Sequence, residues 1–130
     1  MKKTSPTTEP CPCGGASYTA CCAPYHLGTP APTAEALMRA RYSAFVRTLE
    51  PYLLATWHPD TRPDSLNLAE DNTPWLGLKV IRHEVESDDR ATVEFIARYK
   101  INGRAHRLHE TSRFVREHCL WLYVDGTHQE

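Results

Sequence analysis

Four cysteines lie close together near the start of the chain, in the segment CPCGGASYTACCAPYH at residues 11–26. Cys11 and Cys13 form a C-x-C pair, and Cys21 and Cys22 are adjacent. Thiols at this spacing can bind a metal ion, form disulfides or act as nucleophiles. Each of these chemistries makes different demands on geometry and on the cellular compartment.

Disulfides and reactive thiols both fit the cluster poorly. A bond within either pair would close a small strained ring, because bridged cysteines need Cα atoms about 4.4–6.8 Å apart. Bonds between the pairs need an oxidising compartment. The opening residues MKKTSPTTEP contain no apolar run of the kind that forms a secretory signal, so the sequence predicts the reducing cytoplasm. A nucleophilic thiol with His26 as its base would not need four clustered cysteines.

A metal site fits the cluster better. Four thiolates satisfy a closed tetrahedral zinc site, which has a structural rather than a catalytic role. Gly14 and Gly15 supply a turn after the first pair of cysteines, and Pro12 fixes the backbone between them. Residues 1–32 contain six prolines and few large apolar residues, so metal ligation must replace a hydrophobic core there. The sequence therefore predicts a structural Zn²⁺.

The pattern CPCG followed by Y-x-x-CC resembles the SEC-C motif, a small zinc knuckle best known from the tail of the secretion ATPase. That motif has C-x-C, eight residues, and then Cys followed by Cys or His, whereas seven residues separate Cys13 from Cys21 here. The shorter loop leaves His26 as an alternative to Cys22 for the fourth ligand. The ligands implied by the resemblance are Cys11, Cys13, Cys21 and Cys22.

Helical patterns follow the cysteines. Residues 24–32 are rich in turn formers and predict a linker. Apolar residues then recur at helical spacing over residues 32–49, with Thr33 as the N-cap and with Arg41 inside the apolar stripe. A second short helix is predicted to begin at Pro51 and to end at the pair His58-Pro59.

The second half of the chain has the two-residue period of strands. Four strands are predicted at residues 75–85, 91–101, 105–117 and 119–126, separated by turn sequences such as SDD and NG. Helices followed by an antiparallel meander indicate an α+β fold in which the helices pack on one face of a four-stranded sheet. Cys119, at the start of the last strand, is expected to be a small buried residue.

The third predicted strand carries a polar irregularity on its inner face. Leu108, Glu110, Ser112 and Phe114 share one face by alternation, and this face is expected to meet the long helix. A carboxylate there is costly unless it is paired. We therefore hypothesise an ion pair between Glu110 and Arg41 across the helix–sheet interface.

Five segments, ALMRARYSAF, TWHP, WLGL, ETSRF and WLYVDG, occur in the order and spacing of the YchJ-like proteins. The match runs from Cys11 to Gly126. It implies an N-terminal SEC-C motif and a nuclear-transport-factor-2-like, cystatin-related domain, in which a strongly curved sheet surrounds helices and a conical cavity. It implies no reaction. The expected organisation is a disordered tail at 1–10, a zinc knuckle at 11–27 and the α+β domain at 28–130. Proteins of this fold commonly pair through their sheets, so a homodimer is one expectation.

Composition narrows the classes of function. The chain has 130 residues, 41% hydrophobic residues and a net charge of −1, which fits one globular domain with no strong attraction to nucleic acid and no membrane span. The favoured hypothesis is a non-catalytic adaptor. Its knuckle, with Lys2 and Lys3 nearby, would contact a protein partner or the ribosome, because SEC-C elements elsewhere are interaction modules. No base–nucleophile pair emerges from the rest of the chain.

The alternative hypothesis is an enzyme of the isomerase or hydrolase kind that binds a small molecule in the cavity. Glu110 or His58 would act as the base, and Arg41 or Arg113 would stabilise negative charge. His58 could instead simply terminate a helix, and Arg41, Glu110 and Arg113 could form a structural ion-pair network. An open cavity lined by Glu110 would favour the alternative hypothesis.

Overall fold

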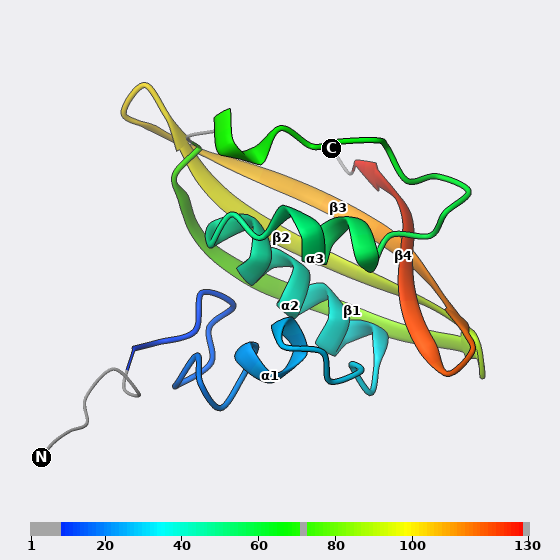
Figure 1. Cartoon of the computed structure of the whole chain (residues 1–130). Helices are drawn as coiled ribbons and strands as arrows, with labels where there is room; N and C mark the ends of the chain where they lie inside the picture. The colour runs from blue at the N-terminus through cyan, green and yellow to red at the C-terminus, as the bar shows by residue number, and fades with distance from the viewer. Residues whose placement is uncertain (1–8, 71–72, 129–130) are drawn as a thin grey trace, which may run out of the picture.

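The computed structural model describes residues 9–70 and 73–128, so most of the predicted tail lies outside the described residues. Helices come first along the chain and strands follow (Figure 1). The α+β class predicted from the sequence is confirmed. None of the helices in the described residues is long and apolar enough to cross a membrane. The elements are α1 (Ala23–His26), α2 (Ala34–Val46), α3 (Glu50–Ala55), the 3-10 turn η2 (Leu68–Glu70), β1 (Trp75–Ser87), β2 (Arg90–Ile101), β3 (Arg104–Glu117) and β4 (Leu120–His128).

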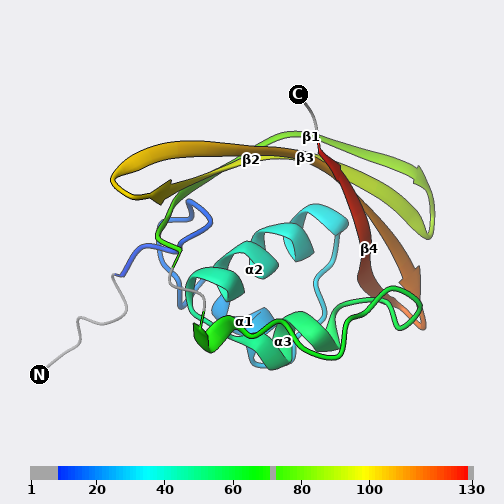
Figure 2. The ribbon, with the colours of Figure 1, turned by 90° about the horizontal axis from the view of Figure 1, so that it is seen from above.

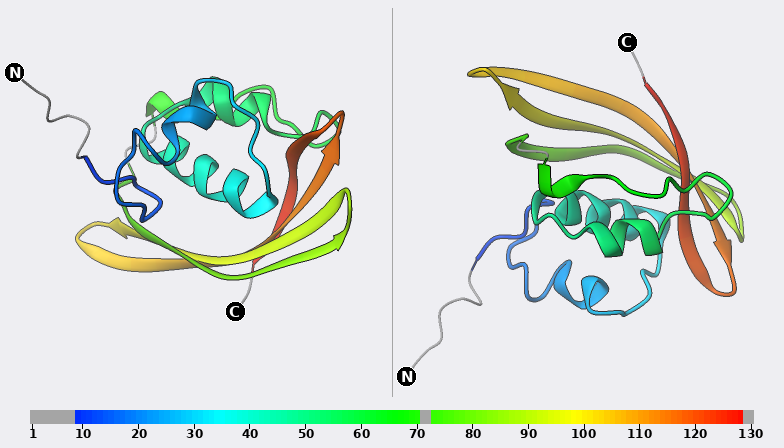
Figure 3. Two further views of the ribbon diagram at one scale, coloured as in Figure 1. Left: turned by 90° about the horizontal axis from the view of Figure 1, so that it is seen from below. Right: turned by 45° about the horizontal axis from the view of Figure 1, so that its top comes forward.

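The four strands form one antiparallel meander in the order β1-β2-β3-β4. The sheet arches over α2, and all three α-helices lie on its concave side (Figures 2 and 3). Register shifts interrupt the β1–β2 pairing at three places and the β3–β4 pairing once, between Arg113 and Phe114. Such bulges bend a strand and increase its twist, which contributes to the curvature.

Two tight turns set the ends of the strands. Asn102 and Gly103 have φ of 51° and 79° and join β2 to β3, as the NG pair predicts. His118 and Cys119 have φ of 54° and 66° and join β3 to β4 in the same manner. Cys119 is therefore exposed in a turn, and the expectation that it is buried was wrong. A two-residue hairpin uses this position for the turn, so β4 begins one residue later, at Leu120.

Helix α2 is buried on two sides. It begins as predicted, because the Ala36 N–H donates to Thr33 Oγ1 at 3.0 Å. Its larger apolar residues pack with residues of the sheet in the main hydrophobic cluster. The small residues Ala40, Ser43 and Ala44 are also fully buried, on the side that meets the cysteine segment and α3. The single apolar stripe read from the sequence is thus only part of the buried surface of this helix.

Helix α3 ends at Ala55, before the predicted stop at His58-Pro59. The chain leaves the helix to pair with β4. The Tyr123 N–H donates to Thr56 O at 2.9 Å, and the His58 N–H donates to Tyr123 O at 2.7 Å. These tertiary hydrogen bonds compete with another helical turn and place Trp57 against the sheet.

The cap of α2 allows a direct test of how this helix begins. Replacing Thr33 with Ala removes the side-chain acceptor for the Ala36 N–H, and we expect the free energy of unfolding to fall by about 1 kcal/mol. Thr33→Ser keeps the acceptor and should behave like the wild type. Urea unfolding followed by circular dichroism measures both. Equal midpoints for Thr33→Ala and the wild type would contradict this assignment of the cap.

Candidate metal centre and cavity

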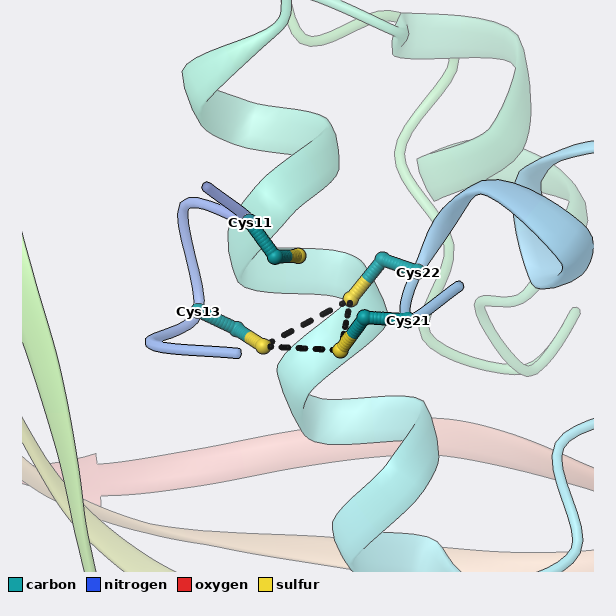
Figure 4. Close-up of side chains that lie close together, drawn as sticks. All are labelled: Cys11, Cys13, Cys21 and Cys22. Atoms are coloured by element: carbon teal, nitrogen blue, oxygen red, sulfur yellow. Dashed lines mark hydrogen bonds between the residues drawn. The ribbon is translucent and has the colours of Figure 1, made fainter. Parts of the chain in front are cut away.

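The four clustered cysteines bring their sulfur atoms together (Figure 4). All four Sγ atoms lie within 4.8 Å of one another. The Sγ atom of Cys13 lies 3.5 Å from that of Cys21 and 3.7 Å from that of Cys22, and the Sγ atoms of Cys21 and Cys22 are 4.0 Å apart. A tetrahedral site with Zn–S distances of about 2.3 Å separates its sulfurs by about 3.8 Å. The cluster therefore has the dimensions of a metal site, and all of its cysteines are free thiols.

Tight backbone turns position the two pairs. The Gly14 N–H donates to Cys11 O at 3.0 Å, and the Cys11 N–H donates to Gly15 O at 3.1 Å, which closes the first turn. The Cys21 N–H donates to Tyr18 O at 3.0 Å and closes the second. Gly15 allows the turns to meet, since a Cβ atom there would lie 2.7 Å from Cys21 Sγ. A larger residue at position 15 would displace that sulfur.

Helix α2 packs directly against the cysteine segment and contacts its sulfur atoms. Ser43 Oγ donates to Cys22 Sγ at 3.3 Å and lies 3.4 Å from Cys11 Sγ. Arg39 Nη1 donates to Cys13 O at 3.3 Å. Cys11, Cys13 and Cys22 are at most 3% exposed, and they belong to the same hydrophobic cluster as the sheet residues. The cysteine segment is therefore part of the domain core.

The electrostatics of the cluster favour a bound cation. A hydrogen bond from the Cys22 thiol, with smaller ones from other donors, lowers the pKa of Cys13 to about 4. Burial raises the pKa of Cys21 to about 12, and the hydrogen bond to Cys13 together with burial raises the pKa of Cys22. The Cys13 thiolate is thus stabilised by S–H donors, and a cation is needed to offset the cost of ionising Cys21 and Cys22 beside it. Metal binding here would release protons.

Both ring nitrogens of His26 form hydrogen bonds with groups other than the clustered sulfurs. Its Nε2 is 2.8 Å from Ala40 O, which can only accept, so Nε2 carries the proton. Nδ1 then accepts from the Tyr18 hydroxyl at 2.6 Å. Burial lowers the pKa of His26 and keeps the ring neutral. This geometry ties the cysteine segment to α2, and it places His26 outside the set of four sulfurs.

A second feature is a cavity of about 290 Å³ between α2 and the concave face of the sheet. Arg41 and Glu110 both line it, but no ion pair within 4.0 Å joins them, contrary to the hypothesis from the sequence. Arg41 Nη1 instead donates to Leu53 O at 2.8 Å and to Thr56 Oγ1 at 2.7 Å. The end of α3 therefore takes the place that the hypothesis gave to a carboxylate.

Glu110 is held by its own strand and by β4. Its Oε1 accepts from Ser112 Oγ at 3.3 Å, and its Oε2 lies 3.1 Å from His128 Nε2. A Cβ atom at Gly126 would lie 2.5 Å from Glu110 Oε1, so the glycine provides the space for this carboxylate. Leu108, Glu110 and Ser112 line the cavity together, as the alternation along the third strand predicted.

The other two candidates for catalysis lie elsewhere. His58 Nε2 is 3.0 Å from Glu117 Oε2, and its Nδ1 accepts from the Asp60 N–H at 3.1 Å. Arg113 is exposed and forms two hydrogen bonds of 2.6 Å to Asp125. Neither residue lines the cavity. The structure thus brings together Arg41 and Glu110 in one cavity, which is the outcome that favours the enzyme alternative, but it places the candidate base His58 and the candidate cation Arg113 elsewhere.

Sequence reasoning missed Ser43, which contacts two of the clustered sulfurs. A signal for Ser43 does exist, because Ala40, Ser43 and Ala44 are small residues at spacings of three and four. Such a row is typical of a helix face that another segment approaches closely.

Comparisons with known proteins identify the family. Residues 33–126 match the family described as YchJ, middle NTF2-like domain. A UPF0225 protein from Chromobacterium violaceum is 54% identical over an alignment of 133 positions, which covers 97% of this chain and 98% of the relative. A UPF0225 protein from Ralstonia nicotianae is 53% identical over an alignment of 131 positions, which covers 92% of this chain and 91% of the relative. The chain belongs to the YchJ-like family.

Solved structures agree with the YchJ-like assignment. A SEC-C motif containing protein from Psychrobacter arcticus superimposes with a TM-score of 0.80 at 32% identity, covering 95% of this chain and 85% of that protein. A SEC-C motif containing protein from Rhodopseudomonas palustris gives a TM-score of 0.82 at 31% identity, covering 94% and 100%. The SEC-C resemblance and the NTF2-like fold expected from the sequence are both supported.

Because Gly15 lies so close to Cys21 Sγ, a side chain at position 15 of this YchJ-like protein is predicted to disturb the sulfur cluster. In Gly15→Ala the new methyl group would meet Cys21 Sγ, so we expect metal affinity to fall about tenfold or more. Competition with a coloured chelator measures the affinity. Ala16→Ser, at an exposed neighbouring position, is the matched control and should bind like the wild type. Unchanged metal affinity in Gly15→Ala would contradict the close contact described between position 15 and Cys21 Sγ.

Proposed function

We propose that Cys11, Cys13, Cys21 and Cys22 bind one structural Zn²⁺ and that this ion holds a non-catalytic binding module in its folded form. The observation that carries the proposal is the convergence of four sulfurs within 4.8 Å, three of them almost completely buried. Four thiolates close the tetrahedral coordination of zinc, so no position remains for a substrate or a reactive water. Such a site supports a fold rather than a reaction.

Zinc ligation would compensate for a segment that has little regular structure. Between residue 9 and the start of α2, the only α-helix is the four-residue α1. Apparent free energies of about 10–16 kcal/mol for structural zinc are comparable to the total stability of a domain of about 5–15 kcal/mol. Ser43, Arg39 and the Ala40 carbonyl connect the segment to three positions of α2. A zinc ion in the cluster would therefore also fix α2.

The proposed partner is a protein that contacts the outer surface of the knuckle, and the ribosome remains one candidate. Exposed knuckle positions include Gly14, Ala16, Thr19 and Ala20, with Leu27 87% exposed nearby. None of these five residues is charged, which suits a protein surface better than phosphate groups. Lys2 and Lys3, which the sequence placed near the knuckle, lie outside the described residues. A reducing cytoplasmic location is part of the proposal, because the cysteines can bind zinc as thiolates but not as disulfides.

The identity of the fourth ligand can be tested by metal content. We expect Cys22→Ser to lose stoichiometric zinc, since the serine hydroxyl is a poor replacement for a thiolate. His26→Gln should keep one zinc per chain, with a stability lower by about 1–2 kcal/mol from its two lost hydrogen bonds. Elemental analysis of the purified, reduced proteins measures the zinc. Cys119→Ser is the control, because this exposed thiol lies outside the cluster.

The opposite pattern would overturn this assignment. Zinc retained in Cys22→Ser but lost in His26→Gln would make His26 the fourth ligand. A wild-type protein that contains no zinc under reducing conditions would remove the proposed site altogether.

Removal of the metal should unfold the protein. Because ligation is comparable to the whole stability of a domain, we expect a strong chelator with a reductant to abolish the cooperative thermal transition. Stoichiometric zinc should restore it. Circular dichroism melting curves measure the effect, with a chelator already saturated with zinc as the control. Identical melting curves with and without free chelator would contradict a structural role.

A further inference from the structure

Arg41 is a buried cation with no anionic partner within ion-pair distance among the described residues. Its side chain lies between α2, the end of α3 and β4, and the residue is only 4% exposed. Among the described residues, no carboxylate lies within 4.0 Å of its guanidinium group. Burying a charge is costly unless it is paired and hydrogen-bonded. The two neutral acceptors bound by Nη1 satisfy only part of that requirement.

The orientation of Arg41 is nevertheless well defined. Both side-chain hydrogen bonds of Arg41 use Nη1, and the guanidinium carbon lies 5.1 Å from the Trp57 ring centre and 4.5 Å from that of Tyr123. These contacts fix one edge of the group and leave Nε and Nη2 without an acceptor in the part of the chain that the structure describes. Arg41 lines the cavity, where these donors can meet a ligand. A fixed guanidinium fork suits a carboxylate.

A second unsatisfied donor belongs to the same cavity. The Nε1 atom of Trp57 is buried and has no hydrogen-bond partner among the described residues. Trp57 lines the cavity together with Arg41. Buried donors that lack acceptors are rare in folded proteins, and each one needs an explanation. A ligand with acceptor oxygens would satisfy both residues at once.

The remaining lining sets the character of the rest of the ligand. Glu110 is occupied by Ser112 and lies near His128, so it does not neutralise Arg41. The other walls are mainly aromatic and aliphatic, which favours an apolar body. The volume of about 290 Å³ could hold a molecule of about ten non-hydrogen atoms, at about 30 Å³ for each water-sized group. The apolar and aromatic wall residues include Met38, Tyr42, Phe45, Trp75, Phe95 and Leu108.

We propose that this cavity binds a small organic acid with an aromatic or branched apolar body, and that the carboxylate of the ligand faces Arg41 and the indole N–H of Trp57. The free edge of the Arg41 guanidinium group and the unsatisfied Nε1 of Trp57 define the anionic end, and the aromatic walls enclose the remainder. The site is separate from the sulfur cluster and needs no chemical step.

The test uses phenylacetate and its neutral analogue phenylacetamide, which have the same shape. Each is titrated into the zinc-loaded full chain, and the indole N–H signals of the tryptophans are followed by nuclear magnetic resonance. We expect saturable binding of phenylacetate, with the largest shift at Trp57, and binding of the amide at least about tenfold weaker. Arg41→Gln should reduce the affinity for phenylacetate to that of the amide.

Two further variants complete the design. Arg113→Gln removes an equivalent charge at an exposed site outside the cavity and should leave the affinity unchanged. Leu108→Trp keeps Arg41 but fills the cavity, and should abolish binding of both compounds. If Arg41→Gln does not fold, the acid–amide comparison on the wild type and the Leu108→Trp variant decide the question.

Three outcomes would overturn the proposal. Equal affinities for phenylacetate and phenylacetamide would remove the role of the anionic group. Binding that survives in Leu108→Trp would place the ligand outside the cavity. The absence of saturation by phenylacetate up to about 10 mM would show that the cavity is not a site for acids of this size.

Discussion

The packing of a cysteine cluster against the back of α2 is the constraint on which the rest of this structure depends. Helix α2 is enclosed by the sheet on one side and by the cysteine segment with α3 on the other. Ser43, fully buried, contacts two of the sulfurs directly. Four thiol groups are poor substitutes for an apolar core unless a cation binds them. A metal ion bound by the cluster would therefore strengthen the core at this point.

One helix connects the sulfur cluster to the cavity. Ser43 faces the cysteines, whereas Arg41, two residues earlier, lines the cavity. Residues two apart on a helix point in different directions, so a single rigid element carries both features. An ion that holds α2 in place would also hold the guanidinium group of Arg41 against Trp57 and Tyr123. Metal binding at the cluster would therefore also help to fix the shape of the cavity.

Local patterns in the sequence predicted α2, α3 and the four strands, but they missed the short helix α1 (Ala23–His26), which overlaps the predicted linker at residues 24–32. Tertiary contacts decided the rest. The period of α2, its Thr33 cap, the four strands and the Asn102-Gly103 turn are all visible in the chain itself. The spacing of the cysteines likewise predicted that their sulfurs would meet. The partner of Arg41 could not be predicted, because the acceptors at Leu53 and Thr56 belong to the end of α3, whose position depends on pairing with β4.

X-ray absorption at the zinc edge of the reduced wild-type protein tests the central claim most directly, because it reports the atoms bound to the metal without any substitution. The account predicts a single shell of four sulfur atoms at about 2.3 Å from zinc. A shell that contains a nitrogen or oxygen atom in place of one sulfur would contradict the closed four-thiolate site. It would then reopen a role in metal binding for a residue such as His26.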